Sequence, residues 1–162
     1  MRGIIARLAC LRWADARRTK VLRRTGLLHR LIYGPDAELR SYEAAVLQAA
    51  LEGLPAGASE KMRQQIGALP SRQRHSDDRV VAFFPDCPGE LPSALFANRQ
   101  DDLLMAEMDL LTSQGVPLHA KLFAANGCFY SIEFDETPRA AGVRDGGLVS
   151  IENARFNPNI DP

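Results

Sequence analysis

The sequence predicts an α+β fold in which N-terminal helices are followed by an antiparallel β-meander of four to five strands. Apolar residues recur with helical spacing as far as Pro70, whereas from Arg79 onward they alternate with polar residues as they do in half-buried strands. Asn126-Gly127 lies between two alternating runs, which is the signature of a tight β-hairpin. With 162 residues, 46% of them hydrophobic, the chain can bury the core of one domain.

Residues 1–34 are predicted to form a basic helical arm that precedes this domain. Ile4, Leu8 and Leu11 follow the spacing of one helical face. The arm holds nine of the 20 basic residues and, in Asp15, one of the 20 acidic residues, so eleven basic and nineteen acidic residues remain in the rest of the chain. The net charge of zero therefore combines a positive arm with an acidic domain, a pattern typical of chains that bind a charged partner.

The domain is predicted to span residues 35–162, with its helices in 35–70. Pro35 suits the first turn of a helix that ends near Gly53. The residues with helical period in this stretch are Leu39, Tyr42, Val46, Ala49 and Ala50. A second helix is expected to be capped by Ser59 and ended by Pro70.

The sheet is expected to cover residues 79–135, after a polar linker from Ser71 to Asp78. Arg79 to Phe84 is rich in Val and Phe and predicts a strand, whereas Leu95-Phe96 can at most begin a short one. Leu103 to Thr112 fits two structures. Residue propensity favours a helix, but the short turn that leads into the next alternating run favours a strand, and we predict a strand.

The register of the Asn126-Gly127 hairpin can be predicted from its apolar residues. A two-residue loop would pair Ala125 with Cys128 and place Lys121 opposite Ile132, which mixes a charge into an apolar face. A three-residue loop keeps the apolar residues together and is the predicted register. Its pairs are Ala124 with Cys128, Leu122 with Tyr130, Ala120 with Ile132, and Leu118 with Phe134.

The opposite face of the same hairpin is predicted to be polar and aromatic. It would carry Phe123 beside Phe129, Lys121 beside Ser131, and His119 beside Glu133. We expect this face to be covered by the helices of the chain, or else by a partner. Beyond the hairpin, Leu148 to Ile151 could add an edge strand, and the tail after Asn153 is expected to be irregular.

No metal site, cofactor site or catalytic motif is predicted. Cys10, Cys87 and Cys128 are widely spaced and fit reduced thiols of a cytoplasmic protein. The three histidines have no metal-ligand spacing, and nucleophile elbows, phosphate loops and dinucleotide fingerprints are missing from the sequence. Glu107 and Asp109 would share one strand face, either acting together or forming a solvated surface. We therefore expect a protein that is not an enzyme.

The basic arm allows three interpretations. Nucleic-acid binding would use phosphate contacts from Arg17, Arg18, Lys20, Arg23 and Arg24. Association with an anionic membrane surface would insert the apolar side of the arm. In the third interpretation the arm docks on the acidic remainder of its own chain.

The order of helices followed by a meander, ending in residues 123–134, resembles small uncharacterised bacterial α+β proteins, among them immunity proteins of contact-delivered toxins. The resemblance covers Ser41 to Asp135 and rests on element order. It implies a non-enzymatic protein-binding module, and charge complementarity would let an acidic surface block the basic cleft of a toxin domain. The candidate partner-binding residues are Asp77, Asp78, Asp101, Asp102, Glu107 and Asp109. The alternative function is binding of nucleic acid or a membrane surface through the arm.

Overall fold

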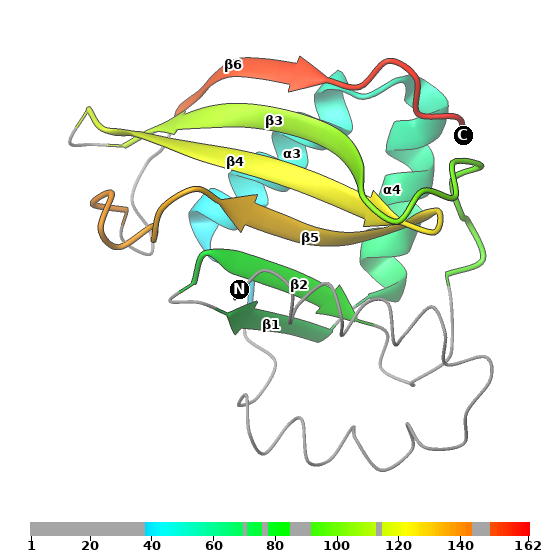
Figure 1. Cartoon of the computed structure of the whole chain (residues 1–162), viewed down its shortest axis with the longest axis horizontal. Coiled ribbons are helices and arrows are strands. Elements are labelled where there is room, and N and C mark those ends of the chain that lie inside the picture. Colours follow the sequence, from blue (N-terminus) through cyan, green and yellow to red (C-terminus); the bar gives the residue numbers. More distant parts are fainter. Residues whose placement is uncertain (1–37, 70, 76–77, 85–91, 113–114, 144–149) are drawn as a thin grey trace, which may run out of the picture.

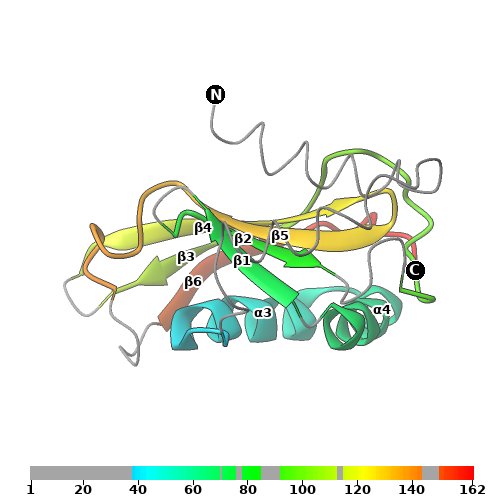
Figure 2. The ribbon, with the colours of Figure 1, turned by 90° about the horizontal axis from the view of Figure 1, so that it is seen from below.

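The computed structural model describes residues 38–69, 71–75, 78–84, 92–112, 115–143 and 150–162, so the predicted basic arm lies outside the described residues. Within these ranges, two helices form one layer and a six-stranded antiparallel sheet forms the other (Figures 1 and 2). The predicted α+β fold, with helices before a meander, is confirmed.

The two helices precede all the strands in the chain. Helix α3 covers Ser41–Gly53 and α4 covers Ala56–Ala68. The strands are β1 (Ser71–His75), β2 (Val80–Phe84), β3 (Leu103–Leu111), β4 (Pro117–Ala125), β5 (Cys128–Phe134) and β6 (Ser150–Phe156). Their order across the sheet is β1-β2-β5-β4-β3-β6, so β3, β4 and β5 form the meander and the two remaining sides are completed by β1–β2 and by β6.

Strand β1 occupies most of the segment that was expected to be a polar linker. It pairs along its whole length with β2, from Ser71 opposite Phe84 to His75 opposite Val80. The polar sequence is compatible with a strand because two arginines find partners on the helix side. Arg74 forms an ion pair with Glu43 of α3, and the Arg72 guanidinium lies 5.9 Å from the centre of the Phe83 ring. These partners are distant in sequence and give no local signal.

Both helices begin at other residues than expected. Helix α3 begins at Ser41, not at Pro35, because Arg40 is extended and its backbone N–H donates to the Glu43 carboxylate at 2.9 Å. In α4 the N-cap residue is Pro55, while Ser59 lies inside the helix and its hydroxyl donates to the Leu51 carbonyl. The predicted ends of the helices, near Gly53 and before Pro70, agree with the structure.

The Asn126-Gly127 hairpin is present, but its predicted register is wrong. The loop has two residues, with φ of 52° at Asn126 and 84° at Gly127, as a type I′ turn requires. A Cβ atom at Gly127 would also lie 2.5 Å from the Phe96 carbonyl oxygen, so glycine is required twice over. The pairs are Ala125 with Cys128, Ala124 with Phe129, Phe123 with Ser131, Leu122 with Ile132, Lys121 with Glu133, and Ala120 with Phe134.

The register changes by one residue between Phe123 and Ala124, which leaves Tyr130 as the extra residue of a β-bulge in β5. The bulge therefore lies inside the strand and not at the turn. It brings Leu122 and Ala120 opposite Ile132 and Phe134, so these residues share the core as predicted. Two aromatic residues differ from the prediction: Phe129 lies in the core and not beside Phe123, and Tyr130 lies on the opposite face.

The ambiguous segment Leu103–Leu111 is a strand, as its context indicated, and it pairs with both β4 and β6. Residues Leu95-Phe96 do not form a strand, although Phe96 is fully buried in the core. The tail is less irregular than expected, since β6 continues through Asn153 to Phe156.

The core lies between the helices and one face of the sheet. From the helices it receives mainly Tyr42, Val46, Leu47, Ala50, Ala58 and Met62. From the sheet it receives the inward residues of β2 to β5, among them Val81, Met108, Leu110, Leu118, Leu122, Phe129 and Ile132. Tyr42 meets Phe134 edge to face, with ring centres 5.6 Å apart.

Candidate functional site

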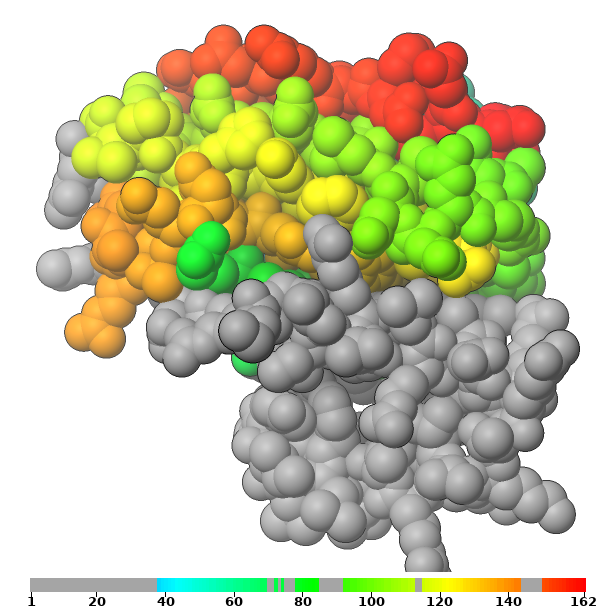
Figure 3. All heavy atoms as spheres, in the orientation of Figure 1, coloured from blue at the N-terminus to red at the C-terminus, as the bar shows by residue number. Residues whose placement is uncertain are grey.

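The face of the sheet turned away from α3 and α4 carries the charged side chains of β3 to β6, and we call it the outer face. Both helices lie on the other side of the sheet (Figure 2). Figure 3 looks onto the outer face, where β6, β3, β4 and β5 follow one another from the top. The expectation that the helices cover this face is therefore not met by the two described helices.

Five side chains of the outer face form a cluster across β3, β4 and β6: Glu107, Asp109, His119, Asn153 and Arg155. The His119 Nδ1 atom lies 2.8 Å from Asp109 Oδ1, and its Nε2 atom lies 3.7 Å from Glu107 Oε2. Asn153 Nδ2 donates to Asp109 Oδ2 at 2.9 Å, and Arg155 Nη1 lies 3.5 Å from Glu107 Oε1. We call this group the carboxylate–histidine cluster.

The strand registers explain why these residues meet. Asp109 lies directly opposite His119, and Glu107 lies opposite Arg155. The register between β3 and β6 changes after Glu107, and Asn153 there has a positive φ of 49°, which marks a bulge that brings its side chain to Asp109. Side chains two residues apart on one strand point to the same face, so Glu107 and Asp109 reach the two ring nitrogens of His119 together.

The cluster keeps Asp109 ionised. Its pKa lies below the ordinary value because the carboxylate accepts hydrogen bonds from Asn153 and His119. The side chains of Glu107, Asp109 and His119 are 27%, 29% and 32% exposed, so they are held by their neighbours and still reach solvent. Within the described ranges, no group of three or more His, Cys, Asp or Glu residues could hold a metal ion.

The predicted pair of His119 with Glu133 is wrong. The bulge in β5 shifts the register, so Glu133 lies opposite Lys121 and the backbone of His119 meets Asp135 instead. Asp135 Oδ1 accepts from the His119 backbone N–H at 3.1 Å, and the Asp135 N–H donates to the His119 carbonyl, also at 3.1 Å.

The predicted acidic residues do not converge on one patch. Glu107 and Asp109 lie together in the cluster. Asp101 and Asp102 lie just before β3, where they accept from Asn126 and Tyr130 of the β4–β5 hairpin. Asp78 lies beside β2, in an ion pair with Arg40. Asp77 is outside the described residues, as are the basic-arm candidates Arg17, Arg18, Lys20, Arg23 and Arg24.

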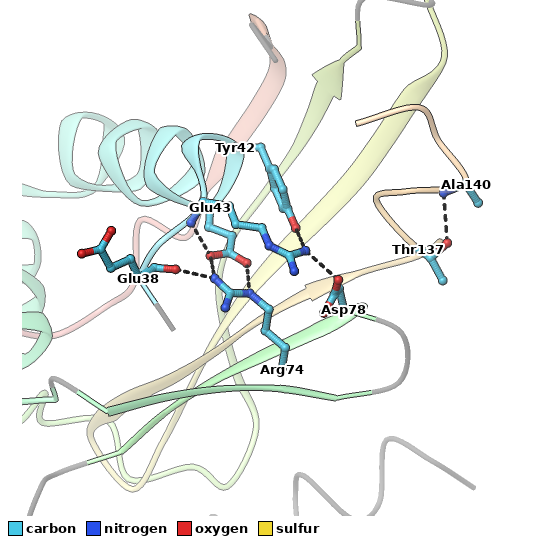
Figure 4. Close-up of polar contacts among 8 residues, drawn as sticks. Glu38, Tyr42, Glu43, Arg74, Asp78, Thr137 and Ala140 are labelled. Carbon is cyan, nitrogen blue, oxygen red and sulfur yellow. Dashed lines mark hydrogen bonds and ion pairs between the residues drawn. The ribbon is translucent and has the colours of Figure 1, made fainter. Parts of the chain in front are cut away.

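Asp78 belongs to a second polar group, which fastens the start of α3 to the β1–β2 hairpin (Figure 4). Arg40 Nη1 donates to Asp78 Oδ2 at 2.6 Å and to the Tyr42 hydroxyl at 3.0 Å. Beside it, Arg74 makes a bidentate contact with the fully buried Glu43 carboxylate, at 2.7 and 2.6 Å. The contacts of this group are internal, so we assign it to the stability of the fold.

Sequence reasoning missed Asn153 and Arg155 as members of the cluster, because the tail was expected to be irregular. The available signal was the pair of apolar residues Ile151 and Phe156, which pack against the core from the helix side of β6. In the part of the chain that is described, no helix has the length and hydrophobicity needed to cross a membrane. Comparison of the sequence with protein-family models, curated proteins and solved structures gives no match.

Proposed function

We propose that this protein is a non-enzymatic binding module that recognises a basic protein surface through Glu107 and Asp109. The observation that carries the proposal is the carboxylate–histidine cluster, where two carboxylates of β3 are held by residues of β4 and β6 and remain 27% and 29% exposed. A side chain on a central strand loses little freedom on binding, because the sheet has already fixed its backbone.

The electrostatics of the cluster favour recognition over proton transfer. A general base works best with a pKa near the working pH, whereas the pKa of Asp109 is lowered by its hydrogen bonds. A carboxylate that stays charged at every physiological pH suits a contact with Lys or Arg of a partner. Such complementarity mainly accelerates association and selects against acidic partners.

The partner class follows from the charge of the chain. Outside residues 1–34, nineteen acidic residues face eleven basic ones, so the domain as a whole repels acidic surfaces and attracts basic ones. The basic cleft of a toxin domain, as implied by the likeness to immunity proteins, is the partner that we propose.

The experiment compares three forms of the tagged full-length chain in capture from the native cells. The wild-type chain is expected to retain a stoichiometric basic partner, and the double variant Glu107→Gln, Asp109→Asn is expected to lose it. The matched control removes two acidic charges from the exposed surface of the helices, by Glu52→Gln and Glu60→Gln. It leaves the outer face unchanged and should retain the partner.

The partner is then purified and its association rate measured at two salt concentrations. We expect the cluster variant to associate about tenfold more slowly at low salt, with little difference at high salt, since steering by exposed charges is screened. Equal capture by the cluster variant and the helix control would exclude recognition through Glu107 and Asp109. A captured partner with an acidic surface would exclude the proposed partner class.

A further inference from the structure

The outer face contains a buried patch that neither described helix covers. It consists of Val80 and Ala82 of β2 and Tyr130 and Ser131 of β5, and we call it the β2–β5 patch. Ala82 and Ser131 have no exposed surface, and Val80 and Tyr130 are 7% and 3% exposed. Residues this inaccessible on a sheet surface require a covering layer.

The strand pairing shows that the patch faces away from the helices. Val81 and Ile132 are paired and lie in the core, so their neighbours Val80, Ala82 and Ser131 point to the other side. Tyr130 points the same way, since its ring lies 6.4 Å from that of Phe123 on the outer face. None of the four patch residues belongs to the core cluster beneath the helices.

Two acidic residues border the patch. Glu133 lies opposite Val80 on β5, and Asp102 accepts the Tyr130 hydroxyl at 3.0 Å. Burial together with this carboxylate raises the pKa of the Tyr130 phenol, so the phenol stays neutral and donates its proton to the hydrogen bond. Beyond β5, the sheet continues to the carboxylate–histidine cluster on β4 and β3. A segment that fits the patch therefore combines apolar side chains with basic ones.

The chain has such a segment in residues 1–34, with nine basic residues, one acidic residue and an apolar stripe of Ile4, Leu8 and Leu11 followed by Trp13. The described chain starts close to the patch, because Arg40 pairs with Asp78, two residues before β2 begins. The 25 residues that follow Trp13, up to Glu38, span about 37 Å even if helical. A six-stranded sheet is about 24 Å wide, so the apolar stripe can reach the patch.

We propose that the basic segment 1–34 docks on the β2–β5 patch of its own chain, with its apolar side on Ala82 and Tyr130 and its arginines toward Glu133 and Asp102. Of the three interpretations of this segment, docking is the one that accounts for the buried β2–β5 patch.

Trp13 reports on the docking directly, because it is the single tryptophan of the chain. In the full-length native protein, its fluorescence should be shifted to shorter wavelength relative to the urea-unfolded protein, and acrylamide should quench it several-fold less efficiently. Ala82→Lys places a charge in the patch and should move both readings toward the unfolded values. The matched control is Ala68→Lys at the exposed end of α4, which should leave both readings unchanged.

Glu133→Lys changes the charge beside the β2–β5 patch without placing a side chain inside it. It is the test variant if Ala82→Lys alters the far-UV circular dichroism and so disturbs the fold. It should release Trp13 in part, and the difference from wild type should shrink at raised salt, because salt screens the charges. Native Trp13 fluorescence equal to that of the unfolded chain would overturn the proposal. So would protected fluorescence that neither patch variant changes, or protection that disappears on dilution, which would indicate docking on a second copy.

Discussion

Replacing Glu43 by Gln should strongly destabilise the protein, because Glu43 balances a buried arginine. Its carboxylate has no exposed surface and accepts hydrogen bonds from Arg74 Nε, Arg74 Nη2 and the Arg40 backbone N–H. The Arg74 side chain is 9% exposed. In Glu43→Gln the negative charge is lost, and an amide NH₂ replaces one of the accepting oxygens. Removing one partner of a buried ion pair costs about 3–5 kcal/mol, and we expect about 3 kcal/mol here because Arg74 also donates to the Glu38 carbonyl.

Urea unfolding measures this loss. With a slope of about 1.5 kcal/mol per M, the midpoint should fall by about 2 M. The control is Glu60→Gln, which breaks the ion pair of Glu60 with Arg63. The side chains of Arg63 and Glu60 are 57% and 55% exposed, so this variant should leave the midpoint unchanged. The double variant Glu43→Met, Arg74→Met should recover most of the lost stability, since removing both charges leaves neither buried alone. A midpoint in Glu43→Gln equal to that of Glu60→Gln would refute the reasoning.

Three further predictions concern stability. Asp109→Asn should lower stability at neutral pH, and the difference from wild type should vanish as the pH falls below about 4, because a lowered folded-state pKa stabilises the fold only while the carboxylate is ionised. Urea unfolding of both proteins from pH 7 to pH 3 measures this difference. Gly53→Ala should cost about 1–2 kcal/mol, since its Cβ would lie 2.1 Å from the Phe156 ring, whereas Gly67→Ala in the open part of α4 should stabilise by about 0.5–1 kcal/mol in thermal unfolding. Gln65→Met should cost about 1–3 kcal/mol, because it removes three hydrogen bonds to backbone groups and leaves the buried Phe129 N–H without its acceptor. Hydrogen exchange of the Phe129 amide should become faster.

The parts of the fold that the sequence predicts are those with a local signal. The helical period between residues 39 and 69 predicts two helices, and alternation with an Asn-Gly turn predicts the β4–β5 hairpin. Strand β1 has no such signal. Its sequence is polar because Arg74 pairs with the carboxylate of Glu43, 31 residues earlier in the chain, and only the tertiary structure shows that the two are neighbours.

The candidate site follows the same division. That Glu107 and Asp109 share a face follows from the period of a strand, which the sequence predicts. The partners of these carboxylates cannot be predicted in this way. His119 lies beside them because of the register between β3 and β4, and Asn153 because of a bulge in β6. A bulge is set by how two strands fit together, and residue types mark it weakly.

The bulge at Tyr130 resolves a conflict between two signals of the sequence. Asn126-Gly127 favours a two-residue loop, and that register alone would place Leu122 opposite Ser131 and Ala120 opposite Glu133. The apolar pattern requires apolar residues at those places, either Tyr130 and Ile132 or Ile132 and Phe134. A three-residue loop satisfies the apolar pattern but loses the two-residue Asn-Gly turn. One extra residue in β5 keeps both the turn and the apolar pattern, and the structure has this bulge. In this register Glu133 lies opposite Lys121, and not opposite His119 as a three-residue loop would place it. The His119 ring contacts Asp109 and Glu107 of β3. The geometry of the proposed binding site thus depends on the β5 bulge, which lets the hairpin keep both its two-residue turn and its buried apolar face.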